Sequence, residues 1–200
     1  MKKLLFIAIL AGLSLIARGQ SSSSSSSKFH KFKFDLTFGY AIPPSNSTSA
    51  SDNVKAGATF VLEPHYRVSD AIAVGFRGEA AALAYGNTSG NGGSANVSAI
   101  YSFCPSLDLY LMNGGFRPFI GGGAGIYYQG SVNVSGSGSG TSSTGYVSLG
   151  SKFGFFPRAG FEAGHFRISA EYNVVGSDAN GNSSNFAAFN IGFFFGGGRK

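Results

Sequence analysis

Residues 152–175 read KFGFFPRAGFEAGHFRISAEYNVV, and this stretch decides the fold. Apolar and polar side chains alternate along it on both sides of a Gly164-His165 dipeptide. Alternation with a period of two is typical of a β-strand with one apolar and one polar face. The stretch therefore predicts two antiparallel strands, 152–163 and 166–175, joined by a tight turn.

The charges on the polar face of this hairpin fall into pairs of opposite sign. Opposed residues of an antiparallel pair point to the same side of the sheet. A two-residue loop therefore places Glu162 opposite Arg167, and Arg158 opposite Glu171. The open question for the whole chain is which of the two faces meets water, a protein core or lipid.

The N-terminus has the features of an export signal. Two lysines precede an apolar run over 4–16, and small residues follow it. This pattern predicts a signal peptide over 1–19, cleaved before Gln20, because the run is too short for a transmembrane helix. A Ser-rich linker over 20–28 and a barrel over 29–200 are expected to follow.

Composition excludes several classes of function. Only 12% of the residues are charged, where about a quarter is usual for a soluble domain. Without the predicted signal peptide the basic excess is small and forms no cluster, so we expect no nucleic-acid partner. Cys104 is the single cysteine, so there is neither a disulfide framework nor a metal-ligand spacing, and no cofactor is predicted. We expect its thiol to point inward and to be buried.

Eight segments of the chain alternate in the manner of strands. Long polar connections alternate with short turns near 69–70, 112–115 and 164–165. An even number of strands with short turns at one end and long loops at the other predicts an all-β fold, an eight-stranded antiparallel up-and-down transmembrane β-barrel. The expected strands are 31–42, 55–68, 72–85, 95–111, 116–129, 152–163, 166–175 and 185–195, and the expected long loops are 43–54, 86–94, 130–145 and 176–184.

The polar face of these strands is predicted to line the barrel interior. The large apolar side chains are too many for the lumen of an eight-stranded barrel, so they must face outward, towards lipid. Buried charges must then compensate one another, and a turn centred on Asp70 places Glu63 opposite Arg77. The same face carries Asp108, Arg117 and Lys152. The predicted interior charge network comprises Glu63, Arg67, Arg77, Glu79, Arg158, Glu162, Arg167 and Glu171.

Prolines and glycines inside the expected strands call for explanation. Pro64, Pro105, Pro118 and Pro157 each remove a backbone donor, so we expect β-bulges at these positions. A row of glycines over 121–125 faces the polar side. It either leaves room for long side chains from facing strands or permits the strand to bend.

Four segments carry a resemblance to a known family. They are RPFIGGGAG at 117–125, PRAGFE at 157–162, RISAEYN at 167–173 and the phenylalanine-rich end at 193–195. With them the chain resembles the small outer-membrane β-barrel family related to the transmembrane domain of OmpA and to OmpX. The resemblance implies location in the outer membrane, in contact with its lipid. The chain departs from the family pattern at its tail, residues 196–200, which we expect to continue beyond the terminal aromatic residue as a short overhang.

The predicted function is non-enzymatic. We expect a monomeric barrel with a structural or surface-contact role, whose extracellular or cell-envelope partners meet the four long loops. One alternative is a narrow pore or transporter for small solutes. Others are a soluble periplasmic carrier and an outer-membrane enzyme, for which His65, two residues from Glu63, is a candidate base without a recognisable nucleophile motif.

Overall fold

The computed structural model describes residues 28–42, 54–89, 92–137, 140–176 and 184–200. The predicted signal peptide (1–19) and the predicted linker (20–28), apart from Lys28, lie outside the described residues. The eight strands are β1 (Phe32–Ile42), β2 (Val54–Arg67), β3 (Ile72–Ser89), β4 (Gly92–Tyr110), β5 (Phe116–Ser137), β6 (Gly140–Ala163), β7 (Phe166–Asn173) and β8 (Phe186–Gly196).

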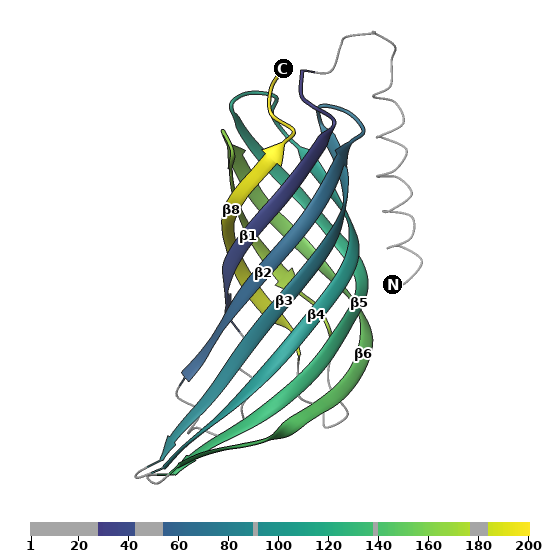
Figure 1. The fold of residues 1–200 in the computed structure, drawn as a ribbon. Coiled ribbons are helices and arrows are strands. Elements are labelled where there is room, and N and C mark those ends of the chain that lie inside the picture. The colour runs from purple at the N-terminus through teal and green to yellow at the C-terminus, as the bar shows by residue number, and fades with distance from the viewer. Residues whose placement is uncertain (1–27, 43–53, 90–91, 138–139, 177–183) are drawn as a thin grey trace, which may run out of the picture.

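The strands form a closed antiparallel barrel in sequence order, so the predicted fold class is confirmed (Figure 1). Strand β1 closes the barrel against β8, with Leu36 opposite Phe193. The three short turns, 68–71, 111–115 and 164–165, lie at one end together with the C-terminus, and we name this end the turn end. The opposite end, where the remaining connections lie, is the loop end.

The register of the β6–β7 hairpin is as predicted. Arg158 lies opposite Glu171 and Glu162 lies opposite Arg167. Gly164 in the turn has a φ of 60°, a left-handed conformation that glycine adopts without a steric penalty. The pattern of alternation therefore determined both the faces and the pairing of these strands.

The central strands are longer than predicted. The predicted loops 86–94 and 130–145 are mostly strand, because β3 runs to Ser89 and β4 begins at Gly92, while β5 runs to Ser137 and β6 begins at Gly140. The Gly/Ser/Asn-rich sequence of these segments shows no apolar alternation, and we therefore predicted loops. Strand pairing needs only backbone hydrogen bonds, which such a sequence can form. The predicted loops 43–54 and 176–184 fall almost entirely on 43–53 and 177–183, outside the described residues.

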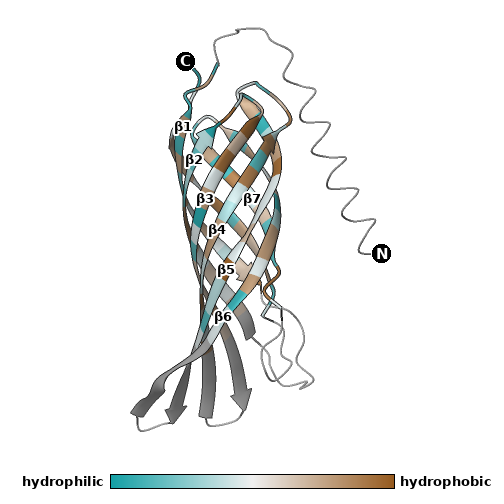
Figure 2. Ribbon diagram, turned by 90° about the vertical axis from the view of Figure 1, so that its right-hand side faces the viewer, coloured by the Kyte–Doolittle hydropathy of each residue, from teal (hydrophilic) through white to brown (hydrophobic). Residues whose placement is uncertain are grey.

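The outer surface of the barrel is an apolar band. Hydrophobic and hydrophilic residues alternate along the strands (Figure 2), and most of the large hydrophobic side chains are exposed. Phe153 is 71% exposed and Phe32 61%. Among the described residues, no helix has the length and the apolar character needed to cross a membrane.

The prediction of bulges at the prolines is wrong. At Pro105 the β3–β4 pairing continues, with Phe76 opposite the proline. On its other side Phe103 pairs with Ile126 and Ser106 with Gly123, so two pairs are skipped with no change of register. A proline removes one donor to one neighbouring strand and leaves the other pairing intact. The register shifts of the described ladders lie instead between β5 and β6, near Gln129 and Ser131.

The C-terminal tail, which continues beyond Phe195, is paired with another part of the chain. Arg199 forms an isolated antiparallel bridge with Phe29. The amide of His30 donates to the oxygen of Gly198 (3.0 Å), and the amide of Lys200 donates to the oxygen of Lys28 (2.9 Å). The tail therefore pairs with the residues before β1 and extends the seam between β1 and β8 at the turn end.

Candidate functional site

Among the residues that the structure describes, the interior of the barrel holds equal numbers of buried acids and buried permanent cations. Every residue of the predicted network is buried there, and Lys152 on the same face is only half-buried. The buried cations are Lys33, Arg67, Arg77, Arg117, Arg158 and Arg167, and the buried acids are Asp35, Glu63, Glu79, Asp108, Glu162 and Glu171. The described residues include one buried histidine, His65. A balanced set of this kind satisfies the requirement that buried charges be paired.

One group of ion pairs crosses the lumen from β6 to β2 and β4. Arg158 donates through Nη1 and Nη2 to both carboxylate oxygens of Glu63, at 2.6 and 2.8 Å. Its Nε donates to Asp108 at 2.8 Å. Arg167 donates to Asp108 (2.9 Å) and to Glu162 (2.9 Å). The bidentate contact of Arg158 with Glu63 and the contacts of both arginines with Asp108 have the short lengths of charge-assisted hydrogen bonds.

A second group lies around Arg77. Its Nη2 donates to Glu171 and lies 3.0 Å from Oε1 of Glu79. Glu79 accepts from Ser102, and Asn173 accepts from the hydroxyl of Tyr127 at 2.8 Å. The Arg77 guanidinium also lies 4.2 Å from the ring centroid of Phe156. This contact is where the charged part of the interior meets its apolar part.

Two of the predicted ion-pair partners are wrong although the register is right. Arg158 lies opposite Glu171 on the barrel wall but bonds Glu63, whereas Glu171 bonds Arg77. Glu63 is likewise in register with Arg77, since Leu62 pairs with Gly78 and His65 with Gly75. Long side chains on an inward-curving wall reach the far side of a narrow lumen, so adjacency along the wall does not choose the partner. Glu162 and Arg167 keep the predicted pairing.

The sequence reasoning placed Asp108 and Arg117 on the polar face without assigning them to the network, and it left out four further residues that contact the network. Lys33 and Asp35 form an ion pair at 3.0 Å, and Lys33 also donates to Glu162. His65 lies 3.1 Å from Asp35, and the hydroxyl of Tyr110 donates to Glu162 at 2.7 Å. The signal for Lys33 and Asp35 was the strict alternation of β1, which already placed them on the polar face.

Asp35, Glu63 and His65 lie close enough together to offer three ligand atoms to a metal ion. Their surroundings argue against that role. Asp35 is paired with Lys33 and Arg167, and Glu63 is paired with Arg158. A divalent cation would displace these neighbours or lie beside their charges. We assign this cluster to the interior network and not to a metal site.

The glycine row of β5 makes room for interior side chains. A Cβ at Gly121 would come within 2.2 Å of Oδ1 of Asp108, and one at Gly123 within 2.9 Å of the ring of Phe156. The thiol of Cys104, which is fully buried as predicted, fills the space beside Gly125 in the same way. Backbone oxygens of β4 lie as close to these positions, since a Cβ at Gly123 would meet the oxygen of Pro105 at 2.4 Å and one at Gly125 that of Phe103 at 2.1 Å. The row therefore makes room both for facing side chains and for the close approach of β4.

An apolar layer fills the interior between the charged groups and the loop end. Ala41, Val175 and Phe186 belong to it and lie where β1, β7 and β8 meet the long connections. The layer comprises Ala41, Ala81, Leu83, Ile100, Cys104, Tyr127, Phe156, Val175, Phe186 and Ala188, each at most 4% exposed. Charged and apolar side chains together therefore pack the lumen in two successive layers.

Comparisons with known proteins bear on the fold. No protein-family model matches the chain, and no curated protein sequence does either. Solved structures similar to it include Neisserial surface protein A, at 14% identity and a TM-score of 0.49, over 82% of this chain and 96% of that one. Another is Ail, the attachment invasion locus protein of Yersinia pestis, at 14% identity and a TM-score of 0.44, over 85% and 100%.

A third similar structure is the N-terminal β-barrel domain of Pseudomonas aeruginosa OprF, at 14% identity and a TM-score of 0.30, over 84% of this chain and 99% of that domain. With such identities and TM-scores these likenesses carry no conclusion about function. The fold rests on the strand order itself. The chain has the fold of the small eight-stranded outer-membrane barrels that its sequence resembles: apolar outside, charged inside and closed by eight antiparallel strands.

Proposed function

We propose that this chain is an integral outer-membrane barrel without an open channel, which acts structurally or by contact through its loop end. The observation that carries this proposal is the inverted distribution of side chains. The strand residues that face outward are large and apolar, while the buried ones include six acids and six permanent cations. A soluble barrel would show the opposite arrangement, because water solvates charges and not phenylalanine rings.

The packed interior supports a closed barrel rather than a pore. Arg77 and Phe156 lie in contact where the charged and apolar layers meet, and both are at most 1% exposed. Water and ions would have to displace ion pairs and then an apolar layer to pass from one end to the other. This packing favours the structural role over the narrow pore or transporter.

Planar-bilayer recording on the purified protein tests the closed barrel. We expect no conductance steps above the background of the bilayer, with a general porin in the same bilayer as positive control. Folding is checked first by the heat-dependent gel mobility typical of membrane barrels. Reproducible steps from the folded wild-type protein would contradict the proposal and favour the pore.

The contacts of His65 give no support to the enzyme alternative. The ring is buried beside Asp35, and the nearby hydroxyl of Ser106 donates to Glu63. A general base must reach the proton that it abstracts, and here the neighbouring groups occupy the imidazole in a packed lumen. We propose no catalytic role for this cluster.

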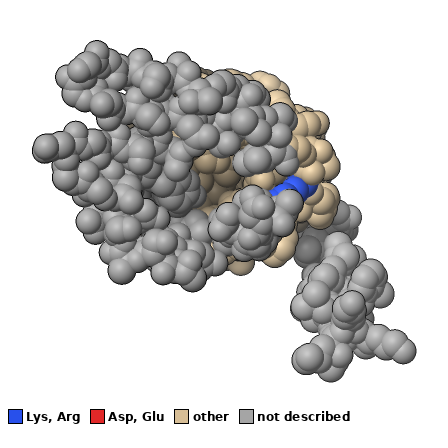
Figure 3. Space-filling view, turned by 90° about the horizontal axis from the view of Figure 1, so that it is seen from below, with Lys and Arg blue, Asp and Glu red and all other residues tan. Residues whose placement is uncertain are grey.

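The loop end is the surface that we propose for contact with partners. Strands β3 to β6 continue beyond the level at which β1, β7 and β8 end and carry a polar, Gly/Ser-rich extension of the sheet (Figure 1). Seen end-on, much of this face is drawn in grey, and the described atoms in view are uncharged apart from a small basic spot (Figure 3). The proposal therefore rests on the position of this extension at the loop end.

Epitope insertion tests which end faces outward. A short tag between Ser137 and Gly140, at the tip of the strand extension, should be labelled by antibody on intact cells. The loop end also carries the long connections 43–53 and 174–185, and outer-membrane barrels place the end with the long connections outside and the end with only short turns in the periplasm. The matched control is the same tag after Asn113 in a short turn, which should be labelled only after permeabilisation. Labelling of the Asn113 tag on intact cells would reverse the orientation.

A further inference from the structure

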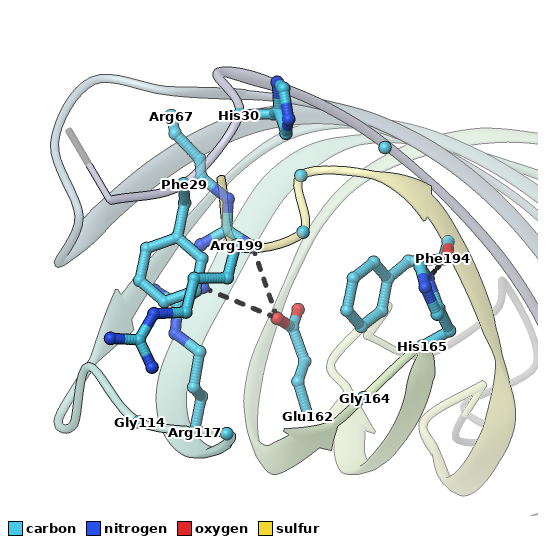
Figure 4. A pocket seen from close by; sticks show the side chains of 14 residues that line it. Phe29, His30, Arg67, Gly114, Arg117, Glu162, Gly164, His165, Phe194 and Arg199 are labelled. Atoms are coloured by element: carbon cyan, nitrogen blue, oxygen red, sulfur yellow. Dashed lines mark hydrogen bonds and ion pairs between the residues drawn. The ribbon is translucent and has the colours of Figure 1, made fainter.

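The turn end of the barrel contains a cavity of about 430 Å³. Turn residues and the C-terminal tail surround it, including Gly115, His165 and Arg199, and Phe29 lies against it from the segment before β1 (Figure 4). Cavities of this size hold small ligands in other proteins. The cavity lies between two of the short turns, 111–115 and 164–165, and the paired chain ends. It therefore opens at the turn end.

Two buried arginines face this cavity and form ion pairs with the same acid, Glu162, while the charge of Asp70 also acts on Arg117. Arg67 and Arg117 are 2% and 3% exposed. Among the described residues, their ion pairs are with Glu162, at 3.4 and 3.9 Å. Charge-assisted contacts of full strength are shorter, about 2.7–2.9 Å. Glu162 also serves Lys33 and Arg167, so one carboxylate is divided among four cations.

Several N–H groups of these arginines have no acceptor among the described residues. Nε and Nη1 of Arg67 and Nη1 of Arg117 are buried without a hydrogen bond. Nη2 of Arg117 is satisfied, because it donates to the backbone oxygen of Asp70 at 2.6 Å. Buried donors of a charged group are costly to leave unpaired. Both residues line the cavity, so positive charge and unpaired donors lie beside it.

Aromatic rings hold the two guanidinium groups in position. The Arg117 guanidinium carbon lies 3.9 Å from the ring centroid of Phe29 and 4.0 Å from that of Tyr110. The corresponding distances for Arg67 are 5.1 and 5.0 Å. Stacking on a ring fixes the plane of a guanidinium and leaves its N–H edge available to a carboxylate or a phosphate. The donors are thus arranged before any ligand arrives.

From these observations we propose that the turn-end cavity binds a small oxyanion, a carboxylate or a phosphate ester, between Arg67 and Arg117. Arg199 adds a further positive charge at the exposed rim of the cavity. In the proposed orientation the turn end faces the periplasm, so the ligand would enter from that side. This origin of the ligand rests on the proposed function. Binding itself does not depend on that orientation.

Titration calorimetry of the folded barrel in an uncharged maltoside detergent tests the proposal. The probes are glycerol phosphate and N-acetylalanine at neutral pH and low ionic strength, where exposed charges are least screened. N-acetylalanine amide, which lacks the charge, is the control. We expect saturable binding of at least one anion and none of the amide. Whichever anion binds more tightly identifies a phosphate ester or a peptide carboxylate as the natural source.

Three variants locate the binding. Arg117→Gln should weaken it about tenfold or more, because it removes a charged donor. Arg199→Gln should weaken it several-fold, and Lys31→Gln, an equally exposed charge loss at the same end outside the cavity, should leave it unchanged. If Arg117→Gln does not fold, the comparison of the two exposed variants decides.

The absence of saturable binding of either anion to the wild-type protein would overturn the inference. Equal weakening by Arg199→Gln and Lys31→Gln would also overturn it, because the attraction would then be a general effect of surface charge. Neither result would alter the proposed closed barrel, which is judged by conductance and by the epitope tags. Conversely, a conducting barrel could still bind the anion, so the two proposals can fail separately.

Discussion

The ion pair between Glu63 and Arg158 offers the sharpest test of the interior arrangement. Both side chains are 2% exposed, and two hydrogen bonds of 2.6 and 2.8 Å join them. Glu63→Gln leaves Arg158 and Arg167 to share Asp108. Arg158→Met leaves Glu63 with Ser106 and His65 as its polar neighbours. Breaking a buried pair in this way costs about 3–5 kcal/mol for each single variant.

The double variant Glu63→Gln/Arg158→Met removes one acid and one cation together, so the interior keeps equal numbers of both. Its loss of stability should therefore be smaller than the sum of the two single losses, with a coupling of about 2–3 kcal/mol. The measurement is reversible urea unfolding of the barrel in lipid vesicles, followed by tyrosine fluorescence and gel mobility. All four proteins of the cycle are compared in the same lipid.

A second cycle with Glu171→Gln and Arg158→Met is the matched control. Glu171 lies opposite Arg158 on the barrel wall but is bonded to Arg77. Its coupling to Arg158 should be smaller than that of Glu63 by about 1 kcal/mol or more. A coupling to Glu171 equal to or larger than the coupling to Glu63 would refute the cross-lumen pairing and restore the pairing along the wall.

Two further substitutions probe the packing. Phe156→Ala should cost about 3–5 kcal/mol in the same unfolding assay, because it opens a cavity in the apolar layer where the ring is 1% exposed; Phe153→Ala, on the 71% exposed neighbour, should cost clearly less, and equal losses would contradict a packed lumen. Gly121→Ala should cost about 1–3 kcal/mol, because its Cβ would meet Asp108 at 2.2 Å. Gly115→Ala, with no atom within 4 Å of its Cβ, should change stability by less than about 0.5 kcal/mol, and a loss as large as that of Gly121→Ala would argue against the crowding.

The faces and the register of the strands could be predicted because they are local properties. Alternation with a period of two assigns each residue to a face, and a two-residue turn at Gly164 fixes the register of β6 against β7. Strand length beyond the apolar band could not be predicted in this way. The residues up to Ser137 and from Gly140 pair through their backbones, and backbone pairing leaves no pattern in a Gly/Ser-rich sequence.

The partners inside the lumen could not be predicted, since they depend on closure of the whole barrel. Arg158 and Glu63 are 95 positions apart in sequence, and only the closed ring of eight strands places β6 across from β2. The hairpin alone offers Arg158 a neighbour on the wall, Glu171, which was the natural but incorrect choice. The same limit applies to Asp35, whose partners Lys33 and Arg167 come from its own strand and from β7.

Among the described residues, six buried acids balance six buried permanent cations, but this balance does not hold at each point of the interior. Arg77 has two acids near it, Glu79 and Glu171. At the turn end, Arg67 and Arg117 share Glu162 with two other cations. A count of these buried charges therefore gives neutrality and misses the local excess. In the middle of the barrel the charged residues form ion pairs across the lumen. At its turn end Arg67 and Arg117 keep unpaired donors, and a bound anion would restore the balance of charge there.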